Sequence, residues 1–242
     1  MSLRRLFGNS KRVLIQLKHD PRSMALIILA PCFLMTILKW VYSSQPQTFQ
    51  LVAGSMLGIF PMLVMFLITS VATLRERISG TLERLLISPL SKVEFILGYA
   101  IAFGFAAFIQ SVIVSTYACG PLGLHVSSSR LSLIWVAILD ALLGVCIGLL
   151  TSSFAQTEFQ ALQFMPAILL PQFLISGLLV PRATMPRVLL DISNFLPLSY
   201  AMDATQKVLM NAGSIARDSS LLLVFIIGIL FLGSLTLKRT SK

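Results

Sequence analysis

The sequence LVAGSMLGIFPMLVMFLITSVATL (51–74) is followed directly by RERISGTLERLLISPLSKVE (75–94) and FILGYAIAFGFAAFIQSVIVSTYA (95–118). The outer two runs are apolar and long enough to cross a bilayer, which takes about 20 such residues. The middle run holds 7 of the charged residues in a chain that has only 19 basic and 9 acidic ones. The pattern predicts two membrane spans joined by a charged, surface-lying segment.

The composition supports a membrane protein throughout. The chain of 242 residues is 56% hydrophobic and 12% charged, which is more apolar and less charged than a soluble domain. Its three cysteines are scattered and form no metal-binding or redox spacing, so we interpret them as buried small hydrophobes. The first 22 residues are basic and interrupted, which does not resemble a cleavable signal peptide. The dispersed positive charge gives no support to nucleic-acid binding.

Hydropathy predicts an all-α integral membrane protein with six transmembrane helices. The fifth is the most polar, because it contains three glutamines and two prolines. Asp20 followed by Pro21 is typical of a helix start and predicts where the first span begins. The predicted spans are 23–42, 51–74, 95–118, 131–150, 159–180 and 220–237.

Lysine and arginine predict the orientation, because such residues are enriched in cytoplasmic loops. Thirteen lie on one side of the predicted spans and five on the other, so both the N and C termini are predicted to be cytoplasmic and the protein is placed in the cell membrane. Lys39 is left uncounted because it could reach the outer interface. The inner set is Arg4, Arg5, Lys11, Arg12, Lys18, Arg22, Arg75, Arg77, Arg84, Lys92, Lys238, Arg239 and Lys242, and the outer set is Arg130, Arg182, Arg187, Lys207 and Arg217.

Segment 75–90 has the pattern of an amphipathic helix on the cytoplasmic side. Its apolar residues recur at helical spacing, Gly80 permits a bend, and Ser88-Pro89 ends the helix. Ser91 and Glu94 then have the spacing of a capping box that opens the third span. One interpretation is a basic loop that lies on lipid headgroups. The acidic residues in the segment favour the other interpretation, docking into a cytoplasmic partner.

Residues 76–90 resemble the ERxxGTLExLLxxPL signature of permease subunits of the type-2 ABC exporter family, close to its daunorubicin-resistance-like branch. The resemblance extends over essentially the whole chain. It includes an amphipathic interfacial helix over 2–20, the six-span layout, and a late pattern formed by Gly177, Pro181, Met185-Pro186 and the run 197–203.

This resemblance implies a permease that exports a hydrophobic or amphipathic substrate such as a drug, antibiotic or lipid-like molecule. Two copies of a separate cytoplasmic ATPase subunit would bind ATP and Mg²⁺, and a second permease, identical or homologous, would complete the complex. The sequence has no G-x-x-x-x-G-K-[ST] phosphate loop, so this chain is not expected to be an enzyme or to bind a cofactor itself. The residues implied for coupling to the ATPase are Arg75, Glu76, Arg77, Gly80, Thr81, Glu83, Arg84, Leu86 and Pro89.

Asp140 lies near the middle of the fourth predicted span, on the helix face that also carries Gly144 and Gly148. A charge at that depth costs roughly 2.5–3.5 kcal/mol on insertion scales. Two interpretations stay open for Asp140: a role in substrate passage or gating, with Gly144 and Gly148 as the other candidate residues, and a structural hydrogen bond between helices. The pairs Gly54/Gly58 and Gly144/Gly148 are G-x-x-x-G patterns, which favour packing within one subunit over a dimer seam.

The connection 181–218 is too long for a turn and too apolar for a free loop. Its interrupted apolar runs predict short re-entrant helices in the outer leaflet. By resemblance it forms an external gate region, with Pro186, Pro197, Tyr200 and Asp203 as its candidate residues.

The predicted organisation is a single transmembrane domain, 1–242. The rival interpretation is an ATP-independent secondary transporter or channel-like protein, which would not need the amphipathic insert and would more often carry several ionisable residues within its spans. The predicted parts are 1–22 (interfacial helix), 23–74 (spans one and two), 75–90 (coupling helix), 91–180 (spans three to five), 181–218 (external region) and 219–242 (span six and tail).

Overall fold

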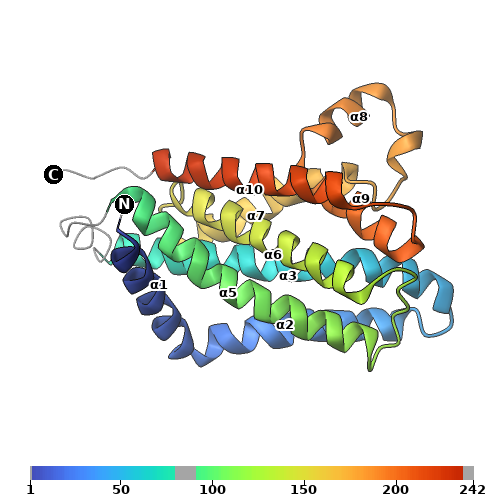
Figure 1. Cartoon of the computed structure of the whole chain (residues 1–242), viewed down its shortest axis with the longest axis horizontal. Coiled ribbons are helices and arrows are strands. Elements are labelled where there is room, and N and C mark those ends of the chain that lie inside the picture. The colour runs from blue at the N-terminus through green and yellow to red at the C-terminus, as the bar shows by residue number, and fades with distance from the viewer. Residues whose placement is uncertain (1, 80–90, 237–242) are drawn as a thin grey trace.

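The computed structural model describes residues 2–79 and 91–236, and all regular structure in these two ranges is helical (Figure 1). The all-α prediction is therefore confirmed for the described residues. The helices are α1 (Leu3–Lys18), α2 (Pro21–Val41), α3 (Pro46–Ile78), α5 (Lys92–Cys119), α6 (Arg130–Ser152), α7 (Glu158–Ile175), the short 3-10 helix η1 (Arg182–Thr184), α8 (Arg187–Asn194), α9 (Pro197–Met210) and α10 (Ala216–Thr236).

Two predicted helix starts are confirmed in detail. Asp20 is the N-cap of α2, where its carboxylate accepts hydrogen bonds from the backbone amides of Arg22 and Ser23, and Pro21 occupies the first turn. Ser91 is the N-cap of α5 and forms the predicted capping box with Glu94. Both motifs satisfy backbone amides that the first turn of a helix leaves without partners.

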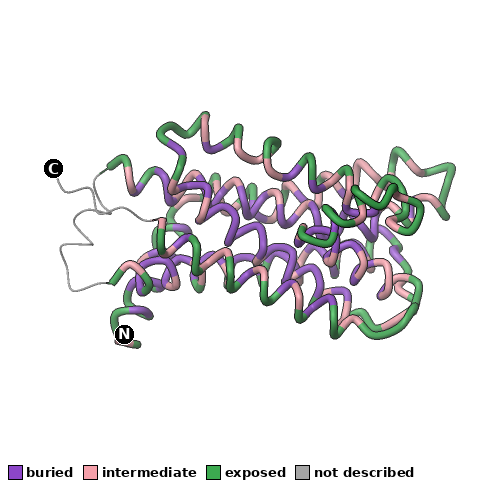
Figure 2. The backbone as a smooth tube through the Cα atoms, turned by 90° about the horizontal axis from the view of Figure 1, so that it is seen from above, coloured by how far each residue is buried: buried purple, intermediate pink, exposed green. Residues whose placement is uncertain are grey.

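Helices α3 and α6 form the centre of the bundle (Figure 1). Most residues of these two helices are buried, whereas few residues of α2 and α10 are. Figure 2 shows the same arrangement, with buried backbone concentrated along the middle of the molecule and exposed backbone at its edges. An apolar exposed face is what a helix presents to lipid, so α2 and α10 have the pattern of outer helices.

Small residues allow α3 and α6 to pack closely. A methyl group added at Gly144 would overlap the carbonyl of Met62, and one added at Gly148 would overlap the carbonyl of Phe66. On the α3 side, a methyl group at Gly58 would overlap the carboxylate of Asp140. These contacts agree with the prediction that the glycine pairs serve packing within one subunit.

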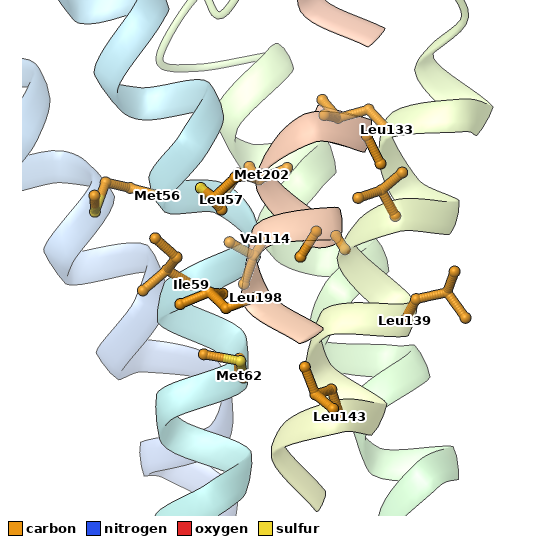
Figure 3. Close-up of a cluster of buried hydrophobic side chains, with 14 of the residues drawn as sticks. Met56, Leu57, Ile59, Met62, Val114, Leu133, Leu139, Leu143, Leu198 and Met202 are labelled. Carbon is orange, nitrogen blue, oxygen red and sulfur yellow. The ribbon is translucent and has the colours of Figure 1, made fainter. Parts of the chain in front are cut away.

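The main apolar core includes residues of α9 (Figure 3). The side chains labelled there come from α3, α5, α6 and α9, so the short helix α9 packs into the bundle as a core element. They are Met56, Leu57, Ile59, Met62, Val114, Leu133, Leu139, Leu143, Leu198 and Met202.

Five helices in the described ranges are long and apolar enough to cross a membrane: α2, α3, α5, α6 and α10. Each of them overlaps most of one predicted span. The remaining predicted span, 159–180, coincides largely with α7, a helix that does not meet this criterion because its glutamines and prolines lower its hydropathy. The predicted external region contains η1, α8 and α9, and α8 projects from the end of the bundle opposite the start of α1 (Figure 1).

Candidate functional site

The last turn of α3 is the candidate site that the structure describes best. Of the predicted coupling residues, Arg75, Glu76 and Arg77 lie in this turn, and α3 continues as one helix to Ile78. The other predicted coupling residues lie outside the described residues: Gly80, Thr81, Glu83, Arg84, Leu86 and Pro89.

Arg75 joins α3 to the start of α7. Its guanidinium donates two hydrogen bonds to the carboxylate of Glu158, with Nε to Oε1 at 2.7 Å and an Nη to Oε2 at 3.0 Å. Both side chains are exposed, at 60% and 46% of their surface. Exposed ion pairs contribute only about 0–1 kcal/mol, so this pair adds little stability.

Glu76 joins α3 to α1 and α5. Its carboxylate accepts hydrogen bonds from both Nη atoms of Arg12, at 3.1 and 3.0 Å, and from the hydroxyl of Tyr99. Arg12 also donates to the Tyr99 hydroxyl at 2.6 Å. The Glu76 side chain is only 6% exposed, so its charge is compensated inside the protein rather than by water.

Glu76 was predicted to contact a cytoplasmic ATPase, and the structure instead gives its carboxylate partners within the chain. A role in docking stays a prediction, but a charge reversal here would place a cation against Arg12. We therefore expect such a change to disturb α1 as well as any coupling, since leaving one buried charge without its partner costs about 3–5 kcal/mol.

Helix α1 is held against α5 by further polar contacts. Asn9 donates from Nδ2 to the carbonyl of Phe95 at 3.2 Å, and the backbone amide of Ser2 donates to Glu94 at 2.6 Å. Gly98 provides the space for this approach, because a methyl group there would overlap the Asn9 side chain. The buried residues of α1 recur at helical spacing, at Leu6, Asn9, Ser10, Val13 and Leu17.

Arg77 joins α3 to α6. Its guanidinium donates to the backbone carbonyl of Ser152, the last residue of α6. The final carbonyls of a helix have no partner within the helix and carry partial negative charge, so an arginine at this position satisfies one of them. Further from the end of α3, the hydroxyls of Ser70 and Thr151 lie 3.4 Å apart and form a second contact between α3 and α6.

Helical geometry explains how three consecutive residues reach different neighbours. Successive side chains of an α-helix point about 100° apart, so positions 75, 76 and 77 face three directions. We call the set Arg12, Arg75, Glu76, Arg77, Tyr99, Ser152 and Glu158 the α3-end network. It connects the end of α3 with α1, α5, α6 and α7, so a displacement of that end acts on all of them.

The sequence prediction missed four members of this network, Arg12, Tyr99, Ser152 and Glu158, and it also missed Asn9, which accepts a hydrogen bond from Arg12. Asn9 offered a signal, because it lies on the otherwise apolar face of α1, where a polar side chain needs a partner. The pairing of Arg12 with Glu76 spans 64 positions, and no local pattern in the sequence specifies it.

Asp140 is fully buried between α3 and α6. Neither carboxylate oxygen has a hydrogen-bond partner among the described residues. The structural interpretation, a hydrogen bond between helices, is therefore not what the described structure shows. Gly144 and Gly148 lie against the backbone of α3 on the same face, and a part for these three residues in substrate passage or gating stays a prediction.

The four candidate residues of the external region lie in one locally bonded unit. Pro186 is the N-cap of α8, and Pro197 occupies the first turn of α9. Tyr200 donates from its hydroxyl to the carbonyl of Asn194 at 2.7 Å, which ties α9 to the end of α8.

Asp203 is anchored by Arg182, which pairs with its carboxylate and also reaches Asn194 at 2.5 Å. Burial raises the pKa of Asp203 above its ordinary value, and the cation of Arg182 opposes that shift. This pair connects the segment after α7 with α9. The described residues contain no group of three or more metal-binding side chains.

Residues 4–210 match the family model described as the ABC-2 type transporter. The chain belongs to this family. This ABC-2 chain is 24% identical over 213 residues to the probable multidrug ABC transporter permease YbhR of Escherichia coli strain K12, covering 88% of the chain and 55% of that protein. It is 27% identical over 179 residues to the probable multidrug ABC transporter permease YbhS of the same strain, covering 73% of the chain and 47% of that protein.

A third relative of this ABC-2 chain is the linearmycin resistance permease protein LnrN of Bacillus subtilis strain 168. The identity is 26% over 142 residues, covering 59% of the chain and 37% of that protein. The chain spans about half the length of the curated relatives it matches first. The relatives are named as permeases, which agrees with a chain built of apolar helices.

Proposed function

We propose that this ABC-2 chain is the permease subunit of an ATP-driven exporter, close to the daunorubicin-resistance-like branch. It moves a hydrophobic or amphipathic substrate, such as a drug, antibiotic or lipid-like molecule, out across the cytoplasmic membrane. Two copies of a separate ATPase subunit, which hold ATP and Mg²⁺, drive it, and a second permease completes the pathway. Family membership and the printed names of the multidrug permease relatives support this proposal.

The placement of α7 supports six crossings with both termini on the same side of the membrane, and the basic residues predict that this side is cytoplasmic. Glu158, the first residue of α7, pairs with Arg75 at the end of α3. Gly177, two residues beyond α7, accepts a hydrogen bond from Gln206 of α9 at the other end of the bundle. Helix α7 therefore runs between the two ends, and its 18 residues extend about 27 Å, close to the roughly 30 Å hydrocarbon core.

The α3-end network is the observation that carries the coupling mechanism. In the proposed mechanism, ATP binding moves the ATPase subunits, and each presses on residues 80–90 of a permease. The end of α3 immediately precedes this segment and is bonded to four other helices. A displacement is thus passed to most of the bundle and changes the side to which the shared cavity opens. ATP can bias that equilibrium only through its different affinity for the two states.

On the outer side, the Arg182–Asp203 pair and the Tyr200–Asn194 hydrogen bond make α8 and α9 one unit, suited to open and close as an external gate. Asp140 lies between α3 and α6, the two helices that such a motion would shift against each other. Its carboxylate would then gain or lose contacts between the two states.

The test is copurification and reconstitution with candidate ABC ATPase subunits from the same organism. We expect copurification, vanadate-sensitive ATP hydrolysis, and ATP-dependent export of an amphipathic dye from cells or into inverted vesicles. Glu83→Arg should abolish export while the permease stays folded, because it alters the segment proposed to touch the ATPase. The matched control is Lys18→Glu, a charge reversal of an exposed residue at the same end of the bundle and outside the α3-end network, which should retain export.

Two outcomes would contradict this function. Failure of the two chains to copurify would remove the ATPase partner. Export that persists without the ATPase, and that follows an imposed ion gradient, would instead support the ATP-independent secondary transporter.

A further inference from the structure

A cavity of about 680 Å³ lies beside the α3-end network. Helices α1, α2, α3 and α5 line it, together with Leu162 of α7. Its size is within the range of pockets that hold small organic ligands, about 300–1,000 Å³. We call it the α1–α2 cavity, because residues at the junction between those two helices line its polar end, which we call the rim.

The cavity wall changes from polar to apolar with depth on three helices. On α3 the lining runs from Arg75 and Glu76 to Val71 and Ala72 and then to Leu67 and Ile68, two turns further from the end of the helix. A ligand that fits this wall has a polar group at the end of the bundle and an apolar part that points along the helices.

The other two helices show the same change with depth. Helix α2 presents Arg22 and Ser23 in its first turn and Leu26 one turn further along. On α5, Tyr99 is followed one turn later by Phe103. Helix α3 ends at this end of the cavity, whereas α2 and α5 begin near it. All three helices thus have their polar groups at the same end of the cavity.

Most charges at the rim are already engaged. Glu76 is bound to Arg12, Arg75 to Glu158, and the Asp20 carboxylate caps α2. The guanidinium of Arg22, in contrast, makes no hydrogen bond or ion pair with any part of the chain that the structure describes. The rim therefore has one cation to offer to a ligand, and arginine binds phosphate groups in a two-pronged geometry.

We propose that the α1–α2 cavity binds a phospholipid of the inner leaflet. The Arg22 guanidinium holds the phosphate, and the upper part of one acyl chain lies between Leu26 and Leu67. This site goes beyond the proposed transport function and needs only that this end of the bundle face the cytoplasm. A bound lipid would fill the space between α1 and α3 and hold α1 in its place beside the α3-end network.

The experiment uses the full-length permease in nanodiscs of equal phosphatidylethanolamine and phosphatidylglycerol. Phospholipids with a photoreactive group in the upper acyl chain are incorporated, and labelled peptides are identified by mass spectrometry. The protein is also extracted into detergent, and retained phospholipid is counted by native mass spectrometry. We expect label on α2 and α3 near Leu26 and Leu67, and a retained phospholipid in the wild type.

Two variants with matched controls test the assignment. Leu26→Trp fills the cavity, while Leu29→Trp places the same ring one turn away on the lipid-facing surface of α2, where Leu29 is 64% exposed. Arg22→Gln removes the phosphate contact, while Lys18→Gln removes an exposed cation that does not line the cavity. Leu26→Trp should abolish retention and Arg22→Gln should weaken it about tenfold, with both controls like the wild type.

Equal retention in each variant and its control would overturn the proposal, since the lipid would then be bound by the general surface. Displacement of the label by soluble glycerophosphate as effectively as by added phospholipid would also overturn it, because the acyl chain would play no part. Label confined to α8, α9 or α10 would place the lipid elsewhere and have the same consequence.

Discussion

The two ion pairs at the end of α3 allow a direct test of whether Glu76 belongs to the bundle. Glu76→Gln and Glu158→Gln are the same chemical change, each opposite an arginine, and the two sites differ in burial. The Glu76 side chain is 6% exposed and its partner Arg12 33%, whereas Glu158 is 46% exposed and Arg75 60%. We expect the first change to destabilise the protein clearly and the second to have little effect.

The magnitudes follow from this burial. Removing one partner of a buried ion pair costs about 3–5 kcal/mol. Arg12 retains partial access to water and glutamine retains one acceptor, so we expect ~2–3 kcal/mol for Glu76→Gln. For Glu158→Gln the exposed pair predicts about 0–1 kcal/mol. Salt should weaken only the second pair, because screening acts mainly on exposed charges.

The assay is the free energy of unfolding in mixed micelles of a mild detergent and SDS. A double-mutant cycle with Arg12→Gln isolates the interaction between residues 12 and 76, and a second cycle does the same for Arg75 and Glu158. We expect a coupling energy of ~2 kcal/mol in the first cycle and under about 1 kcal/mol in the second. Equal coupling energies in the two cycles would refute the placement of Glu76 inside the α3-end network and would leave its carboxylate available to a partner.

Three further changes have defined expectations. Gly144→Ala should destabilise the protein by about 1–3 kcal/mol, because the added methyl group overlaps the Met62 carbonyl. The control Gly228→Ala on α10 adds a methyl group with nothing within 4 Å and should leave stability unchanged. Thermal unfolding measures both. Asp140→Asn should leave the bundle folded, since no described donor contacts that carboxylate; unchanged export and assembly would remove its gating role. Hydrogen bonds from Ser23 and Arg22 lower the pKa of Asp20. The ~1 kcal/mol that this helix cap contributes to the free energy of unfolding should therefore be present above a pH of about 3.9 and decrease as the pH falls below it. Asp20→Ala should lack this contribution at every pH.

The helix starts could be predicted because their causes are local. Asp20 with Pro21, and Ser91 with Glu94, place every interacting group within four residues, so the sequence alone contains the whole motif. The position of most membrane-crossing helices is predictable for a similar reason. Their length and apolarity are properties of one continuous segment.

The α3-end network was not predictable in this way because its partners are distant in the sequence. Glu76 meets Arg12 over 64 positions and Tyr99 over 23, and Arg75 meets Glu158 over 83. These pairs depend on how the helices pack, which in turn depends on small residues such as Gly98. The charges of this region were recognised from the sequence, but whether they faced a partner or the bundle was decided by packing.

Segment 75–90 therefore has two parts, residues 75–77, which bind the bundle, and residues 80–90, which we expect to contact the partner. Arg75, Glu76 and Arg77 lie in the last turn of α3, and their charged groups bind neighbouring helices. A change in any of them therefore alters contacts within the bundle. Residues 80–90 follow directly and contain the rest of the family signature. A coupling segment needs one part that is fixed to the bundle and another part that contacts the ATPase. Arg75, Glu76 and Arg77 are fixed to the bundle, so we expect the residues after position 79 to contact the ATPase.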